Sequence, residues 1–372
     1  MTARSTIYHW ITFWLLLLLL AVFGPFLLWI GEPTKSLNVL IIDKTVPTMS
    51  YREHQGLVWV LNHLKYRDST VGGTFNAGRD YVGFFPNQDG PLRMMPVAPT
   101  GRDLDLLYLA DTYGVYSQDF TEAPSSERAE LIFGGLNAPE LEALEPVFSS
   151  AATVIAEFNT LASPTTAPVR ERLEELFGVT WTGWTGRRFA SLKRDSDVPG
   201  WLVRNWERQT ARDWTFSAPG FAIVHDDGRI VLLLEGQDVA RNGLRVDFPE
   251  SLVDEVGVSD ETPYGYWFDV VEPRRDVLVV AQYQLAVTDS GSRVLQTAGL
   301  PERFPAIVHR KIGQSRRYYF AGDFADLRRV PWVFRVRGVS WLRRWGVRGE
   351  LQFFWNVYLP LMRWILMLQT TR

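Results

Sequence analysis

Three apolar runs in the first half of the chain each end in an acidic residue. Uninterrupted apolar runs of this length are typical of strands that are buried on both faces of a sheet. The runs are residues 37–43, 104–111 and 153–157, and the acids that end them are Asp43, Asp111 and Glu157.

Amphipathic patterns lie between these runs. Leu57, Leu61 and Leu64 share one face of a helix after the first run, and residues 138–148 carry apolar side chains every three positions before the third. Strands that alternate with helices predict βαβ units and a parallel sheet. Ligands of such sheets bind outside the carboxyl ends of the strands, so we expect the three acids to meet at one edge.

The second half of the chain predicts short antiparallel strands. The turn sequence Asp226-Asp227-Gly228 separates two strand-like runs and is a strong hairpin signal. A last hairpin is expected from residues 306–310 and 317–321, which flank Gly313. Additional antiparallel strands should therefore extend the sheet.

Residues 11–30 are apolar and carry no charge, which predicts a membrane-spanning helix. A cleaved signal peptide is the alternative, but the run is longer than the usual apolar segment of about 7–15 residues and lacks a small-residue cleavage site. Arg4 precedes the run, whereas Glu32 and Lys35 follow it. We expect residues 1–36 to form a single-pass anchor in the cytoplasmic (inner) membrane, with the main domain, residues 37–326, outside the cytoplasm.

The segment from 327 to 372 is basic and rich in tryptophan. Seven arginines and no acid occur between Arg328 and Arg348, and residues 351–368 form a further apolar run with Arg363 near its middle. An arginine at the centre of a span costs roughly 2.5–3.5 kcal/mol on insertion scales. An interfacial helix is therefore favoured over a second membrane span, and the lipid bilayer is an expected partner.

Composition excludes several classes of chemistry. The chain has no cysteine, so a thiol nucleophile, a disulfide and a thiolate metal site are all excluded. A net charge of −3 argues against a nucleic-acid partner. The five histidines lack the spacing of a helical zinc site, and no serine elbow or phosphate-binding loop is present. We expect no cofactor and no metal.

The order of elements resembles the class I glutamine amidotransferase-like superfamily. The resemblance lies in DLLYLADTYG, a GGL turn, TVIAEFN and the late hairpin FPAIVHRKIGQSRRYYFAGDF, and it covers about residues 37–326. It implies a mostly parallel, flavodoxin-like α/β sheet with helices on both faces. Glutaminase chemistry would need a cysteine, so the resemblance is to branches without amidotransferase activity.

The candidate site combines acids, aromatic rings and one guanidinium. Two neighbouring carboxylates can divide the roles of general acid and base, so Glu157, Asp111 and Asp43 are candidate catalytic groups. The alternative is that each carboxylate caps a helix or binds loop amides. Candidate ligand-binding residues follow the same strands or lie nearby, and Trp181 and Trp184 either form a sugar-stacking platform or pack in the interior; the full set is Asn159, Thr165, Trp181, Trp184, Arg187 and Tyr113.

Two functions follow from these features. The first is a membrane-anchored binding or assembly component of the cell envelope, with an envelope glycan or a membrane protein as its partner. The alternative is a carboxylate-dependent hydrolase of envelope or exported glycans.

Overall fold

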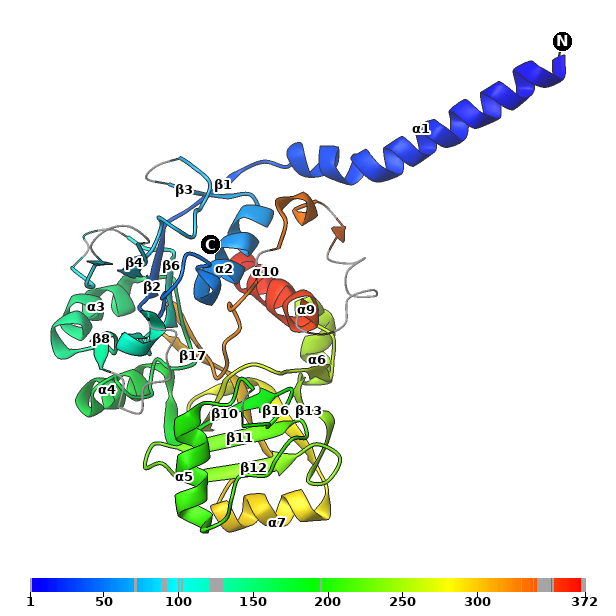
Figure 1. Cartoon of the computed structure of the whole chain (residues 1–372). Helices are drawn as coiled ribbons and strands as arrows, with labels where there is room; N and C mark the ends of the chain where they lie inside the picture. The colour runs from blue at the N-terminus through cyan, green and yellow to red at the C-terminus, as the bar shows by residue number, and fades with distance from the viewer. Residues whose placement is uncertain are drawn as a thin grey trace.

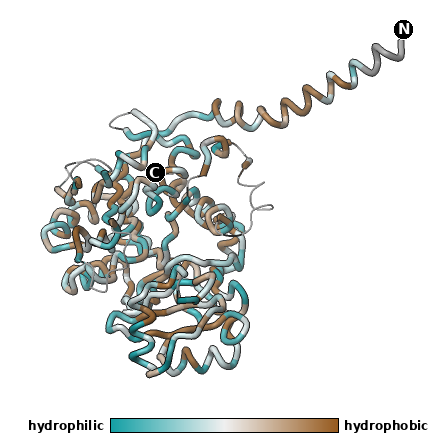
Figure 2. The backbone as a smooth tube through the Cα atoms, in the orientation of Figure 1, coloured by the Kyte–Doolittle hydropathy of each residue, from teal (hydrophilic) through white to brown (hydrophobic). Residues whose placement is uncertain are grey.

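The computed structural model shows an α/β body from which one long helix projects (Figure 1). It describes residues 2–69, 72–87, 92–99, 101, 103–120, 130–194, 196–328, 330–336, 338–339, 349 and 351–368. Hydrophobic segments run through the strands of the body and along the projecting helix (Figure 2).

A ten-stranded mixed sheet forms the centre of the body. Its order is β14-β13-β16-β17-β18-β9-β6-β2-β4-β5. The five central strands are parallel: β18 (Ser315–Phe320), β9 (Thr153–Glu157), β6 (Leu106–Asp111), β2 (Val39–Asp43) and β4 (Val82–Phe85). The flanking strands are antiparallel: β17 (Arg303–Ile312), β16 (Leu278–Val287), β13 (Val239–Asp247), β14 (Thr262–Pro263) and β5 (Arg93–Met94).

This sheet corrects the prediction of a mostly parallel, flavodoxin-like sheet, although the α/β class is confirmed. The reason is the last hairpin: β17 and β18 pair around Gly313, and β18 then pairs in parallel with β9. Because a hairpin reverses chain direction, β17 is antiparallel to β18, and the outer pairs β16–β17, β13–β16 and β13–β14 are antiparallel as well. The predicted hairpins at Gly313 and at Asp226-Asp227-Gly228 are both present.

Helices cover both faces of the parallel strands (Figure 1). On one face lies α2 (Arg52–His63), and on the other lie α3 (Ala138–Ser150) and α4 (Ala167–Phe177). The start of α3 is fixed by a capping box between Asn137 and Glu140. Glu140 also accepts a 2.6 Å hydrogen bond from the buried Lys44 ammonium, so the cap ties α3 to the end of β2.

A second, four-stranded antiparallel sheet is built by the middle of the chain. Its order is β12-β11-β10-β15, formed by β12 (Ile230–Leu234), β11 (Gly220–His225), β10 (Val179–Phe189) and β15 (Phe268–Pro273). The helix α5 (Gly200–Thr210) packs on it through a small apolar cluster that includes Leu202 and Trp214. Trp181 and Trp184 therefore lie on a strand, which Gly183 interrupts with a bulge at φ 85°.

The remaining elements are short or peripheral. Two small pairs are β1 (Lys35–Leu37) with β3 (Tyr66–Asp68) and β7 (Val115–Tyr116) with β8 (Leu131–Phe133). The helices are α6 (Glu250–Leu252), α7 (Asp289–Ala298), α9 (Leu351–Phe353) and α10 (Leu359–Met367).

The C-terminal helix belongs to the core, which differs from the interfacial or membrane-spanning helix expected at residues 351–368. Trp355, Leu361, Met362 and Ile365 are at most 1% exposed. The segment continues from α9 through a π-helical turn, Phe354–Tyr358, into α10, and it packs against α2. Its apolar side chains are buried against protein. Most of the preceding basic segment lies outside the described residues.

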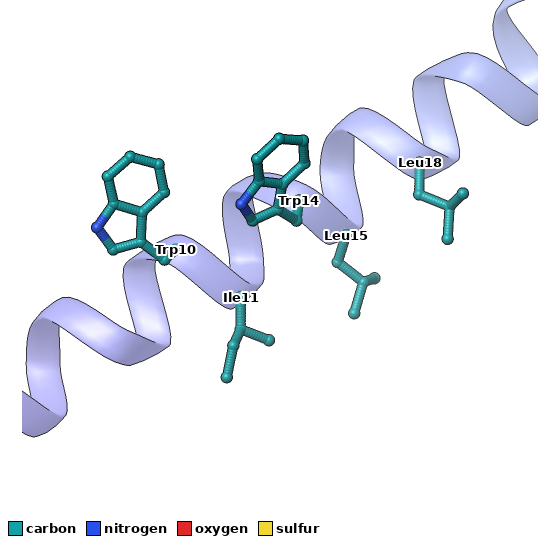
Figure 3. Close-up of a pocket in the computed structure, with 5 residues that line it drawn as sticks. All are labelled: Trp10, Ile11, Trp14, Leu15 and Leu18. Carbon is teal, nitrogen blue, oxygen red and sulfur yellow. The ribbon is translucent and has the colours of Figure 1, made fainter.

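The projecting helix α1 (Thr2–Ile30) is the one helix in the described part of the chain that is long and apolar enough to be a membrane anchor or a signal sequence. None of the span Tyr8–Ile30 is buried against the body. A groove of about 450 Å³ on its surface is lined by Trp10, Trp14 and aliphatic side chains, which project outward (Figure 3). A helix with this exposure is suited to a lipid environment.

Candidate functional site

The carboxyl edge of the parallel strands gathers the three acids, as the sequence predicted. Asp43 and Asp111 are register partners in the β2–β6 pair. Glu157 ends β9, which pairs with β6 on its other side. The predicted convergence is confirmed, but the three carboxylates have different surroundings and therefore different roles.

Glu157 is fully buried and holds the segment that crosses the edge. Its carboxylate accepts hydrogen bonds from the backbone N–H groups of Phe324 and Ala325, each at 3.1 Å, and from the Tyr108 hydroxyl. The Tyr108 oxygen lies 2.9 Å from the Tyr358 oxygen of the C-terminal helix. Burial raises the pKa of Glu157 well above its usual value although these hydrogen bonds oppose the shift. Glu157 is thus a structural connector between three segments.

Asp43 is also fully enclosed. One carboxylate oxygen accepts from the Thr45 N–H at 3.0 Å, and the other lies 2.5 Å from Nδ1 of His54. The second ring nitrogen of His54 lies 2.8 Å from the Ala77 carbonyl oxygen. Both ring nitrogens of His54 therefore have hydrogen-bond partners within the protein. This buried pair fastens α2 to the end of β2.

Of the three acids, Asp111 is the one whose pKa lies near neutral pH. Its carboxylate accepts from the Thr45 hydroxyl at 2.8 Å, the Tyr113 N–H at 2.7 Å and the Asn159 amide at 3.3 Å. Burial, followed by the charge of Asp43, raises the pKa of Asp111 to about 7. Asp111 can therefore exchange a proton at physiological pH.

Other charged groups at this edge were missed by the sequence analysis. Glu53 opens α2, and Asp323 and Asp326 lie in the segment that Glu157 holds. Burial, and then the charges of Asp43 and Asp326 respectively, raise the pKa values of Glu53 and Asp323. Arg52 forms a two-pronged ion pair with Asp326, at 2.8 and 2.5 Å. They were missed because their positions follow no regular pattern and depend on the path of the chain after β18.

Arg187 lies close to this group, on β10. Its guanidinium carbon is 4.8 Å from the ring centre of Phe189 and 5.5 Å from that of Trp267. The Trp267 ring is stacked on Phe158, which follows Glu157, with 6.0 Å between ring centres. Burial lowers the pKa of Arg187, the charge of Asp197 opposes this shift, and smaller effects come from Arg52, which lowers the pKa, and from Asp326 and Asp323, which raise it. The predicted guanidinium is therefore at the edge, next to an indole that was not predicted.

Trp181 and Trp184 do not form the predicted platform. Trp184 is buried, with its ring against His225 and under the Arg229 guanidinium. The Trp181 ring lies under Arg170, 5.4 Å from the guanidinium carbon, and its indole N–H points to the Trp184 carbonyl. Both rings are used in packing around the β10 bulge, which is the alternative left open by the sequence.

Of the remaining predicted residues, two make structural contacts and one is exposed at the rim of the edge. Asn159 donates to Asp111 from a left-handed backbone conformation, φ 66°. Thr165 is buried and accepts from the Leu136 N–H, so it supports a turn. Tyr113 is 42% exposed beside the Tyr116 ring and can meet a ligand. Among the described residues, no group of three or more histidine or acidic side chains has metal-binding geometry.

No family model and no curated protein matches the chain. Solved structures with some likeness include the carbohydrate deacetylase Agd3 (TM-score 0.32, 9% identity, 78% of this chain and 30% of that chain). Two others are β-galactosidases, from Rahnella sp. R3 (TM-score 0.36, 10% identity, 90% and 32%) and from Bacillus circulans sp. alkalophilus (TM-score 0.34, 11% identity, 78% and 30%). This chain spans about a third of their length. These neighbours are carbohydrate-active enzymes by name, and likeness at this level carries no argument about the function of this chain.

Proposed function

We propose that this chain is a membrane-anchored component of the cell envelope that binds an acidic, hydroxyl-rich ligand such as a glycan at the carboxyl edge of its parallel strands. In this proposal α1 is an uncleaved anchor in the inner membrane, and the α/β body lies outside the cytoplasm. The body is an amidotransferase-like domain without amidotransferase chemistry, since the chain has no cysteine.

The carboxyl edge has a sealed interior and an accessible rim. The carboxylates of Glu157 and Asp43 are fully buried, and their oxygens have partners within the protein. The Arg52 side chain is 43% exposed and Tyr113 is 42% exposed, while Arg187 and Trp267 are half-buried. A ligand that meets this edge therefore meets guanidinium groups and aromatic rings first, which favours binding over catalysis by Glu157.

The observation that carries the proposal is the environment of the Arg187 guanidinium. Its guanidinium lies over the rings of Phe189 and Trp267, and no carboxylate of the described residues is within ion-pair distance, although the charge of Asp197 acts on it. A half-buried guanidinium without a carboxylate partner is suited to bind an anionic group in a two-pronged contact. The neighbouring Trp267 offers an apolar face of the kind that packs against sugar rings.

The proposal is tested by titrating the full chain in detergent with acidic and neutral oligosaccharides, followed by tryptophan fluorescence. Arg187→Gln should weaken binding of the acidic oligosaccharide about tenfold or more, because charge-assisted hydrogen bonds contribute roughly 1.5–3 kcal/mol. Arg241→Gln is the matched control, since Arg241 is exposed on β13. Equal binding by the Arg187→Gln variant, or no response to any acidic oligosaccharide, would refute the proposal.

A second candidate function is a carboxylate-dependent glycan hydrolase, and the pKa of Asp111 favours it. A general acid works best with a pKa near the working pH, and the pKa of Asp111 is about 7. Glu157 cannot supply the partner carboxylate because the segment at 324–325 covers it. In this hypothesis Asp111 is the general acid, and its pKa is raised by burial and then by the charge of Asp43.

Hydrolysis of a glycan panel by the full chain separates the two functions. If the second function holds, Asp111→Asn should abolish hydrolysis and keep ligand binding, and the wild-type rate should fall above about pH 7 as Asp111 loses its proton. If the wild type binds acidic glycans without cleaving them, the hydrolase hypothesis is wrong and the binding hypothesis is retained.

A further inference from the structure

A second cavity lies at the opposite end of α2 from the acids, between the end of that helix and the C-terminal helix. It measures about 260 Å³ and is lined by His63, Glu255, Val256, Leu359, Arg363 and Trp364, among others. Pockets for drug-sized ligands are usually larger, about 300–1,000 Å³. This cavity therefore suits a small polar group such as a lipid headgroup.

His63 gives the cavity a polar group that lacks a partner. Nδ1 of its ring is buried and has no hydrogen bond among the described residues, and the ring lies close enough to the Arg335 backbone for that backbone to raise its pKa. Burial, and then the charges of Arg363 and Arg335, lower the pKa of His63 to about 4. A neutral imidazole carries one proton, and with that proton on Nε2 the unpaired Nδ1 is an acceptor for a hydroxyl group.

Positive charge dominates around this acceptor. Arg363 is exposed at the cavity, and Arg335 approaches the His63 ring. Glu255, the one acid among the described residues that line the cavity, accepts a 3.2 Å hydrogen bond from the Trp364 indole. The cavity thus presents a guanidinium for a phosphate and an imidazole nitrogen for a hydroxyl.

The cavity lies where the projecting helix joins the body. The Trp29 indole donates to the backbone carbonyl of His63 at 2.8 Å. The Lys65 ammonium lies 3.3 Å from the Ile30 carbonyl oxygen and 4.5 Å from the Trp29 ring centre. His63 therefore both lines the cavity and contacts the end of α1, so a bilayer that holds α1 lies close to this part of the body.

We propose that this cavity binds the headgroup of an anionic phospholipid of the phosphatidylglycerol type, with the phosphate on Arg363 and a headgroup hydroxyl donating to Nδ1 of His63. The proposal rests on α1 being a retained membrane anchor, which is part of the proposed function, and is independent of the ligand at the carboxyl edge. The apolar side chains of Leu359 and Val256 complete the wall.

Native mass spectrometry of the full chain, purified from membranes in detergent, tests the site. The protein is exposed to equal amounts of phosphatidylglycerol, phosphatidylmethanol and phosphatidylcholine; phosphatidylmethanol carries the same charge without a hydroxyl. We expect phosphatidylglycerol to be retained best. Arg363→Gln should lower its retention about tenfold, the effect of losing a charge-assisted contact. His63→Phe keeps the stacking on Trp59 and should make phosphatidylglycerol and phosphatidylmethanol equal.

Controls separate this site from the other proposals. Arg293→Gln, on the exposed side of α7, and Arg187→Gln, at the carboxyl edge, should both retain lipid like the wild type. Unchanged retention in Arg363→Gln would overturn the site, and equal retention of the two anionic lipids by the wild type would overturn the role of His63. An intact mass that lacks α1 would overturn both the anchor and the lipid site.

Discussion

Two apolar helices of this protein occupy opposite environments. α1 has no part of its span buried against the body, whereas α10 and the π-helical turn before it are buried almost completely. The difference lies in what each can pack against. The helix α2 is apolar on nearly all sides, with every residue from Gly56 to Asn62 buried, so its outer face needs a cover. The C-terminal helix is that cover, and apolar content alone does not separate a membrane helix from a core helix.

A charged residue introduced into each helix should have the largest effect, and it should affect the two helices differently. Met362→Asp puts an unpaired carboxylate at a fully buried position of α10 and should destabilise the body by more than about 4 kcal/mol. Leu18→Asp lies on exposed α1 and should leave the unfolding midpoint of the body unchanged. Denaturant unfolding in detergent, followed by tryptophan fluorescence, measures both.

In a membrane-extraction experiment the order of the two variants should be reversed, with the larger effect in Leu18→Asp. Leu18→Asp should weaken insertion by roughly 2.5–3.5 kcal/mol and release more protein on alkaline washing. If Met362→Asp instead left stability unchanged, the C-terminal helix would not be part of the core.

The hydrogen bonds that connect the C-terminal helix to the carboxyl edge sharpen the comparison. Glu157→Gln replaces an oxygen that accepts backbone N–H groups with a group that donates, so we expect a loss of about 1–3 kcal/mol in the free energy of unfolding. Tyr358→Phe removes only the outer hydroxyl and should cost about 1 kcal/mol. An unchanged Glu157→Gln protein would show that the edge is held by other contacts.

A pH-dependent effect is expected at His63, where α1, α2 and the C-terminal cavity meet. Its pKa in the folded protein is about 4, below the usual value near 6.5. The unfolded chain therefore binds more protons between these values, and stability should fall as pH is lowered from 6.5 to 4, by up to about 1.4 kcal/mol per pH unit.

The comparison of wild type with His63→Phe isolates this contribution, because the acids of the carboxyl edge titrate in both proteins. The wild type should lose more stability on acidification than the variant. Parallel pH profiles would show that His63 is not held neutral in the folded state.

The sequence predicted the elements whose signals are local. The apolar runs that end in Asp43, Asp111 and Glu157 are parallel neighbours, because continuous hydrophobicity marks strands buried on both faces. The hairpin at Gly313 was also predicted from local turn chemistry.

The errors arise where one segment depends on another far away in the chain. The role of Glu157 is set by backbone N–H groups of residues 324 and 325, and the packing of α10 by its contact with α2. Neither relation leaves a periodic pattern in the sequence. A soluble fragment of residues 37–326 would lack the C-terminal helix and expose the apolar side of α2, so the full chain is the right object for binding experiments.

The late position of α10 also sets an order of events during biosynthesis. β2, α2 and β6 are complete by residue 111, but the side chains that shield α2 lie beyond residue 350. At synthesis rates of roughly 5–20 residues per second, the apolar surface of α2 stays exposed to solvent for on the order of tens of seconds before the C-terminal helix is made. A nascent chain of this kind should depend on holdase chaperones until its last helix emerges.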